Sequence, residues 1–176
     1  MVAGQRVEIR AGRVVLREVL PAEAERLVDG GPRDGSWADG YPLPGTLPPA
    51  RALIAQAHDG VWRPGFGMYQ IVLPANGGDQ PGAVIGDIGF HTAPLVGSVE
   101  IGYGIVPIHR RHGYVTEAVN ALTAWALTQP GVTEVRAETE PDNVASQNVL
   151  IRAGYALVDV TAEARRYHRI GAASRG

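Results

Sequence analysis

The sequence contains no cysteine and no lysine, so its 16 basic residues are all arginine. Without cysteine, the chain forms no disulfide or zinc–thiolate site and offers no cysteine nucleophile for an acyl-enzyme intermediate. Without lysine, a lysine Schiff base and a P-loop lysine are excluded. A coding bias toward alanine, glycine and arginine is the simplest explanation of the missing lysine.

Long apolar runs and a strong net charge are missing as well. No stretch approaches the roughly 20 apolar residues of a membrane span, and residues 1–13 lack the apolar core of a signal peptide. The formal net charge of −2 differs from the basic balance of a nucleic-acid-binding domain. We therefore expect a cytoplasmic protein with neither a nucleic-acid nor a membrane partner.

What remains is the composition of an ordinary globular domain. The 176 residues are 45% hydrophobic and 19% charged, which suits one domain with a sizeable core. No internal repeat or linker divides the chain. We expect a single domain over residues 1–176.

Hydrophobic periodicity and capping signals predict strands and helices. Strands are expected over residues 12–20, 67–74, 82–91, 98–106, 132–140, 155–160 and 166–170. Helices are expected over 21–30, 50–60, 142–154 and within 107–127. A meander followed by a βαβ crossover gives an α/β (α+β) fold. Its sheet is mixed and mostly antiparallel, with six to seven strands and helices on both faces.

The strand at 98–106 has two different faces. Its odd-numbered residues, from Val99 to Ile105, are apolar or aromatic, whereas Glu100, Gly102 and Gly104 share the other face. One carboxylate beside two glycines predicts an open channel along that face. The alternative is that the glycines accept a close-packed helix.

The segment from Pro107 to Leu127 predicts an anion site. Unpaired amides at a helix N-terminus, together with the helix dipole, attract an anion. Gly113 allows close approach of the backbone, Arg110 and Arg111 add charge-assisted hydrogen bonds, and Thr116 offers a hydroxyl. The alternative is an ordinary strand–turn–helix with solvated arginines.

Two motifs carry a family resemblance. "RRHGYV" at 110–115 resembles the [QR]-x-x-G-x-[GA] signature of the GNAT acyltransferase superfamily. The longer "EIGYGIVPIHRRHGYVTEAV", with "ETEPDNVASQNVLIRAGY" after it, resembles the ribosomal-protein N-terminal (Rim-type) branch. The resemblance is close over residues 84–159 and weaker over 12–170. It departs from the signature at Val115, where glycine or alanine is preferred.

The resemblance implies a GNAT-like fold with a splayed pair of parallel strands, 98–106 and 132–140, that admits acetyl-CoA. Backbone amides of residues 111–116 would hold the pyrophosphate, and residues 106–108 would bind the pantetheine arm. Asn148 is equally well read as a surface residue, and no metal is expected. The implied coenzyme-binding residues are Val106, Ile108, Arg110, Arg111, His112, Gly113, Tyr114, Val115, Thr116, Asn143, Asn148 and Arg152.

Acyl transfer to an amine requires a base, because an ammonium has no lone pair. Glu100 is the expected base by its place before the phosphate loop, and His91 is the second candidate, since histidine titrates near neutral pH. Either residue is alternatively an ordinary structural or solvated side chain. The oxyanion needs a donor, and the resemblance implies a backbone amide at the splay, around Val106.

The leaving thiolate requires an acid. The resemblance places Asn143 and Ser146, an N-x-x-S motif, beside the thioester. Many GNAT enzymes use a tyrosine four residues before a Gly-aromatic pair, but this sequence has Ile151 near that position. Ser146 is therefore the predicted acid, and direct attack in a ternary complex is the predicted mechanism.

The acceptor is expected to contact the long Gly- and Pro-rich loop at 31–49. Trp37, Asp39 and Tyr41 are the candidate substrate-binding residues, although Trp37 alternatively pins the loop to the core. Three functions stay open: acylation of a protein N-terminus, acylation of a small amine, and a catalytically silent acyl-CoA sensor. The resemblance also leaves open a homodimer and a longer acyl donor.

Overall fold

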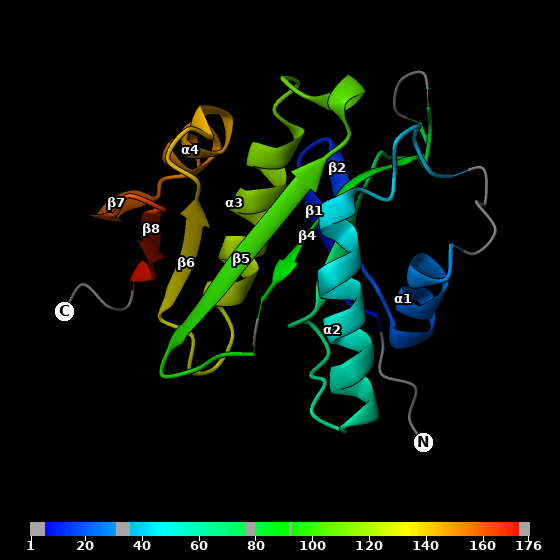
Figure 1. Cartoon of the computed structure of the whole chain (residues 1–176), viewed down its shortest axis with the longest axis horizontal. Helices are drawn as coiled ribbons and strands as arrows, with labels where there is room; N and C mark the ends of the chain where they lie inside the picture. Colours follow the sequence, from blue (N-terminus) through cyan, green and yellow to red (C-terminus); the bar gives the residue numbers. More distant parts are fainter. Residues whose placement is uncertain (1–5, 31–35, 77–79, 92, 173–176) are drawn as a thin grey trace.

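The computed structural model describes residues 6–30, 36–76, 80–91 and 93–172. They form one sheet in the order β1-β2-β3-β4-β5-β6-β8-β7, covered by helices on both faces (Figure 1). The strands are β1 (Glu8–Ala11), β2 (Val14–Glu18), β3 (Met68–Val72), β4 (Val84–Phe90), β5 (Ser98–Ile105), β6 (Glu134–Thr139), β7 (Ala156–Val160) and β8 (Arg165–Ile170). The helices are α1 (Pro21–Val28), α2 (Leu47–His58), α3 (Tyr114–Leu127) and α4 (Val144–Arg152), with single 3-10 turns η1 (Pro44–Thr46) and η2 (Pro107–His109).

The predicted fold class is confirmed. Only β5 and β6 run parallel among the strand pairs of the described chain, and every other pair is antiparallel. The sheet has eight strands rather than six or seven, because β1 was not anticipated. The expected strand at 12–20 is in fact the turn and second strand of a hairpin, in which Ala11 pairs with Val14.

The start of α2 also differs from the prediction. The helix begins at Leu47, three positions before the expected Ala50. Pro48 and Pro49 occupy its first turn, where an amide hydrogen has no helical partner and its absence costs little. Pro48 and Pro49 therefore belong to the helix and not to the loop predicted at 31–49.

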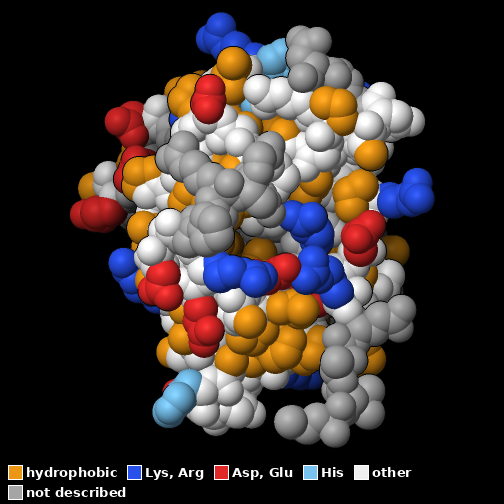
Figure 2. Space-filling model, turned by 90° about the vertical axis from the view of Figure 1, so that its right-hand side faces the viewer, with side chains coloured by type: hydrophobic (Ala, Val, Ile, Leu, Met, Phe, Trp, Pro, Cys, Tyr) orange, Lys and Arg blue, Asp and Glu red, His pale blue; other side chains and the backbone are white. Residues whose placement is uncertain are grey.

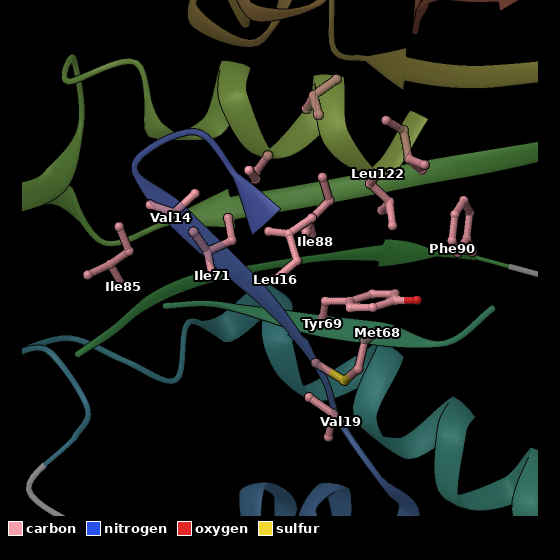
Figure 3. Close-up of a cluster of buried hydrophobic side chains, with 14 of the residues drawn as sticks. Val14, Leu16, Val19, Met68, Tyr69, Ile71, Ile85, Ile88, Phe90 and Leu122 are labelled. Atoms are coloured by element: carbon pink, nitrogen blue, oxygen red, sulfur yellow. The ribbon is translucent and has the colours of Figure 1, made fainter. Parts of the chain in front are cut away.

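α3 covers one face of the sheet and forms the main core. Its buried residues include Ala118, Val119, Leu122 and Ala126, which recur at helical spacing. Figure 3 shows Leu122 above the side chains of the central strands, among them Ile88. This packing fixes the start of α3 relative to the end of β5.

α1 and α2 lie on the opposite face, with α2 in front of the strands in Figure 1. Met68 points toward α2 in Figure 3, away from the α3 side. The side of the molecule that carries α1 shows arginine and carboxylate side chains interspersed with hydrophobic ones (Figure 2). Within the described residues, no helix combines the length and the apolar character that crossing a bilayer requires.

β5 and β6 separate partway along their length. Their ladder joins residues 98–101 to residues 134–137 and stops at the pair Ile101–Ala137. β5 continues to Ile105 and β6 to Thr139 without pairing to each other. The predicted splay is therefore present, and it opens toward the N-terminus of α3.

Candidate active site

The turn before α3 presents free backbone amides. Gly113 is the N-cap residue and has a left-handed φ of 83°, and Arg111 has φ of 65°. The first bond of the helix runs from the N–H of Glu117 to the carbonyl of Gly113, at 3.1 Å. Within the described chain, no backbone or side-chain acceptor takes the N–H groups of residues 111–116. This is the geometry of an anion site.

A contact from the β1–β2 hairpin holds this turn. Arg13 donates from Nε and Nη2 to Oε1 of Glu117, at 2.8 and 2.6 Å, and from Nη2 to the carbonyl of His112, at 2.6 Å. The bond to Glu117 raises the pKa of the Arg13 guanidinium. Arg13 therefore neutralises a carboxylate that would otherwise repel an anion at the helix N-terminus. No local pattern predicts this pair, because its members lie 104 positions apart.

The other predicted residues of the turn surround its amides. Arg110 and Arg111 are exposed and form no ion pair within the described residues, so both are free to reach an anion. The His112 ring stacks on Tyr114, with centroids 5.6 Å apart. Val115 and Thr116 are half-buried in the first turn of α3.

The expected role of Val106 requires a correction. Its N–H donates to Ile85 at 2.9 Å, and its carbonyl accepts from His109 at 3.1 Å, so it has no free amide for an oxyanion. The alternation along a strand explains this, because even-numbered residues of β5 bond to β4. Odd-numbered Tyr103 and Ile105 direct their backbone groups into the splay instead. The neighbouring Ile108 has a side chain that is exposed to solvent.

A hydroxyl pair bridges the splay. The hydroxyl of Tyr103 on β5 lies 2.7 Å from Oγ of Ser146 on α4, and burial raises the pKa of Tyr103 to about 12. Asn143 caps α4, since its Oδ1 accepts the N–H of Ser146 at 3.1 Å. The resemblance selected Asn143 and Ser146 but not Tyr103, which was read only as part of an apolar face. Asn148 and Arg152 lie exposed one helical turn apart on α4.

His91 and Glu100 form a second pair. Nδ1 of His91 lies 2.9 Å from Oε1 of Glu100. The other ring nitrogen, Nε2, lies over Gly102, where an added Cβ would collide with it. An imidazole that donates Nδ1–H to a carboxylate leaves Nε2 as an acceptor. The two base candidates are thus brought together, with Glu100 behind the ring and Nε2 toward β5.

A cavity of about 550 Å³ lies between α2 and strands β3 to β5. The channel predicted along Gly102 and Gly104 is thereby confirmed. Its wall is mostly apolar, with Leu43, Pro48, Pro49, Ala52, Leu53, Met68 and Phe90 among the lining residues, and it also carries His91, Tyr103 and Asp87. Within the described residues, no cluster of His, Asp or Glu side chains has the grouping of a metal site.

Asp87 is, with Tyr103, a residue of this site that the sequence did not predict. Its side chain is 7% exposed, its Oδ2 accepts a bond from the Thr46 hydroxyl, and burial raises its pKa to about 6. A lone carboxylate in the otherwise apolar strand "VIGDIGF" was the signal that could have found it.

The aromatic residues of the long loop do not line this cavity. Tyr41 is 1% exposed and packs edge-to-face with Trp37, with ring centroids 5.5 Å apart. Trp37 forms a bridge to Val84, the first residue of β4, so it pins the loop to the sheet, as the alternative interpretation proposed. Tyr41 is therefore a core residue rather than a pocket wall, and Asp39 is exposed. The loop reaches the cavity through Leu43 and Gly45 instead.

Comparison with known families agrees with this geometry. Residues 13–156 match the model of the acetyltransferase (GNAT) domain. The chain belongs to the GNAT acetyltransferase family. The match contains the GNAT turn at residues 110–116, the splay, and both side-chain pairs.

Individual relatives share a modest fraction of identical residues with this GNAT domain. The uncharacterized N-acetyltransferase YjdG of Bacillus subtilis is 36% identical over 85 residues, or 48% of this chain and 51% of YjdG. The chain spans about half the length, or less, of the curated relatives it matches. An acetyltransferase structure from Agrobacterium tumefaciens is 26% identical, with a TM-score of 0.65, covering 96% of this chain and 97% of that one. RimL, a ribosomal L7/L12 alpha-N-protein acetyltransferase in complex with coenzyme A, shares the fold at 17% identity, with a TM-score of 0.64 and coverage of 94% and 98%.

Proposed function

We propose that this protein transfers an acetyl group from acetyl-CoA to a primary amine, by direct attack in a ternary complex. One observation carries the proposal: the turn with free amides before α3, the β5–β6 splay and the cavity with His91 all border the same strand, β5. GNAT membership supports this reading, as does the coenzyme A bound to the structurally similar RimL.

The coenzyme would lie along the splay. Its diphosphate would accept hydrogen bonds from the amides of residues 111–116, and Arg110 and Arg111 would add charge-assisted contacts. The pantetheine arm would bond to the backbone of Tyr103 and Ile105, which face the gap. This shifts the expected oxyanion donor by one residue from Val106, to an amide of the unpaired part of β5.

His91 would act as the base and Glu100 as its orienting partner. The reacting amine loses a proton to Nε2 as its nitrogen attacks the thioester carbon, and the carboxylate stabilises the imidazolium that results. This order reverses the ranking from the sequence, which put Glu100 first. The reason is geometric, because Oε1 of Glu100 is engaged with Nδ1, while Nε2 lies over Gly102, which lines the cavity.

Ser146 and Tyr103 would complete the transfer. The new C–N bond forms, the C–S bond breaks, and the thiolate takes a proton from this hydroxyl pair. Because burial raises the pKa of Tyr103 to about 12, its hydroxyl stays protonated at neutral pH and can restore the proton of Ser146. Tyr103 thus supplies, from a strand, the tyrosine hydroxyl that Ile151 does not supply from α4.

The cavity favours a small amine as the acceptor. Its volume of about 550 Å³ lies within the usual range for small-molecule sites. A protein N-terminus is the second candidate, supported by the Rim-like motifs and by the fold shared with RimL. Trp37 and Asp39 remain predicted contacts for such a larger acceptor.

The test is thiol release from acetyl-CoA with a panel of small amines and peptides, alongside calorimetric titration with coenzyme A. Turnover of an amine supports the proposal, and the acceptor class that reacts fastest decides between the candidates. Tight coenzyme binding without turnover of any acceptor would favour the acyl-CoA sensor. Absence of coenzyme binding would overturn both.

A further inference from the structure

Asp87 is a buried carboxylate without a counter-ion. Its Oδ2 accepts from Thr46, while Oδ1 forms no hydrogen bond within the described residues, and no arginine or histidine there forms an ion pair with it. A buried charge is costly unless it is paired and fully hydrogen-bonded. The open side of this carboxylate faces the cavity, of whose wall it is a part.

Glu18 shows what a structural carboxylate looks like in the same sheet. It is 1% exposed, and both its oxygens are satisfied, Oε2 by the N–H of Val7 at 2.9 Å and Oε1 by the N–H of Gly65 at 2.5 Å. Asp87 lacks such a second donor and borders an empty volume. A ligand that enters the cavity can therefore supply the second hydrogen-bond donor for Asp87.

The carboxylate and the base contact different parts of the cavity. Asp87 is the register partner of Gly104, whereas the imidazole of His91 covers Gly102. Two residues of a strand span about 7 Å. The cavity that both residues line has a mostly apolar wall, to which Met68 and Leu53 contribute.

Asp87 is also unsuited to hold the reacting nitrogen itself. A nearby negative charge favours the protonated form of an amine and opposes its deprotonation, whereas attack requires the neutral form. A neutral imidazole such as His91 is the better neighbour for the nucleophile, and a carboxylate is the better neighbour for a group that stays charged.

We propose that Asp87 binds a second cationic group of the acceptor. The substrate class is then a primary amine that carries another ammonium or a guanidinium at the far end of a short apolar chain. Thr46 holds one carboxylate oxygen in place, and the second cation takes the other. This inference rests on the proposed function, since it names the acceptor of the same reaction.

The experiment compares acceptors that differ only in the second charge. Putrescine and cadaverine are assayed by thiol release against butylamine and pentylamine, with the wild-type protein, Asp87→Asn and Asp29→Asn. Asp29 is an exposed carboxylate at the end of α1, outside the cavity, and serves as the matched control. Loss of one charge-assisted hydrogen bond predicts a fall in kcat/KM for the diamines of about 10- to 100-fold in Asp87→Asn.

The monoamines should change by less than about threefold in that variant, because they make no contact with Asp87. Equal losses on diamines and monoamines would overturn the proposal and place Asp87 at the reacting amine. A wild-type protein without preference for the diamines would overturn it as well. Asp29→Asn should behave like the wild type.

A binding measurement separates this inference from the proposed function. Putrescine is titrated calorimetrically into protein saturated with coenzyme A. If no amine is turned over but putrescine binds and Asp87→Asn abolishes its binding, the cation site stands and the proposed transfer fails. Binding that Asp87→Asn leaves unchanged, or no binding at all, overturns the cation site.

Discussion

Burial raises the pKa of the Asp87 carboxyl from 3.8 to about 6. On acidification the unfolded chain takes up this proton only near pH 4, whereas the folded chain takes it up near pH 6. Between these values the folded state binds more protons, so this group lowers the free energy of unfolding as the pH rises from about 4 to about 6. A shift of about two pKa units corresponds to about 3 kcal/mol. This decrease in the free energy of unfolding is complete above about pH 6.

Replacement of Asp87 by asparagine should therefore stabilise the protein at neutral pH. Asparagine can still accept the bond from Thr46, and it has no charge to desolvate. We expect Asp87→Asn to raise the free energy of unfolding by about 1–3 kcal/mol at pH 7 and to give no such gain at pH 4. Urea denaturation of both proteins at the two pH values measures this, and an equal gain at both would show that ionisation of Asp87 costs no stability.

The His91–Glu100 pair makes a second prediction at the residue scale. His91→Gln should lower kcat by about 10²- to 10⁴-fold, because it removes the base. Glu100→Gln should lower it less, because glutamine can still accept the bond from Nδ1 that orients the ring but carries no charge to stabilise the imidazolium formed during attack. Steady-state rates between pH 5 and 9 measure both effects. An active His91→Gln beside an inactive Glu100→Gln would restore Glu100 as the base.

Tyr103 and Ser146 are expected to act as one unit. Ser146→Ala and Tyr103→Phe should each lower kcat by about 10-fold or more with little change in coenzyme affinity, and the double variant should be little worse than the worse single one. Single-turnover rates of the three variants form the cycle that measures this coupling. Effects that multiply would mean that the two hydroxyls act separately.

At the scale of elements, most of the fold could be predicted because each element has its own period and its own ends. α4 illustrates this, with Asn143 as its N-cap and Gly154 just beyond its last turn. β1 was missed, because four residues, Glu8–Ala11, are too few for alternation to be distinguished from a polar terminus. Its pairing depends on β2 and not on any pattern of its own.

The candidate site was predictable where its residues are consecutive in sequence. The turn at 110–116 and the Asn143–Ser146 motif each lie within a few residues, so local motifs revealed them. The sequence did not predict Asp87, because the residues around its carboxylate belong to α2 and η1, which lie in a different part of the chain. Tyr41 was assigned to the pocket for the converse reason, since its burial results from packing that no local pattern encodes.

The contact between the β1–β2 hairpin and α3 makes a prediction at this scale. Arg13→Gln should weaken coenzyme A binding by about 3- to 10-fold, because it leaves the Glu117 carboxylate uncompensated at the anion site. Arg10→Gln is the matched control, since Arg10 is an exposed residue of β1 without a side-chain partner among the described residues. Calorimetric titration of both variants with coenzyme A measures the two affinities. Equal affinities would show that Arg13 does not contribute to coenzyme binding.

At the scale of the whole molecule, a short ladder joins the two parts of the sheet. Strands β1 to β5 lie on one side of it and β6 to β8 on the other, and the ladder between them pairs residues 98–101 with residues 134–137. A ligand in the splay would connect the two parts along the rest of their length. The homodimer suggested by the family resemblance stays a prediction.

Coenzyme A should therefore stabilise the protein against heat. At a concentration of about 100 times Kd, binding adds about 2.7 kcal/mol to the free energy of unfolding, or about 5–11 °C in Tm for a domain of this size. Pantetheine, which fills the splay but lacks the diphosphate, should give a much smaller shift at the same concentration. Differential scanning calorimetry measures both, and equal shifts would indicate that the amides before α3 do not grip the diphosphate.

The separation of β5 from β6 also fixes a length. In the proposed complex, one end of the coenzyme arm would be anchored at Gly113, the N-cap of α3, and the gap closes at the Ile101–Ala137 pair. Between those two points, the length of the unpaired edge of β5 would determine where the thioester carbon lies relative to the imidazole of His91. Inserting one residue between Val106 and Gly113 would displace that carbon by up to about 3.3 Å. The variant would then bind coenzyme A with unchanged affinity but would transfer the acetyl group much more slowly.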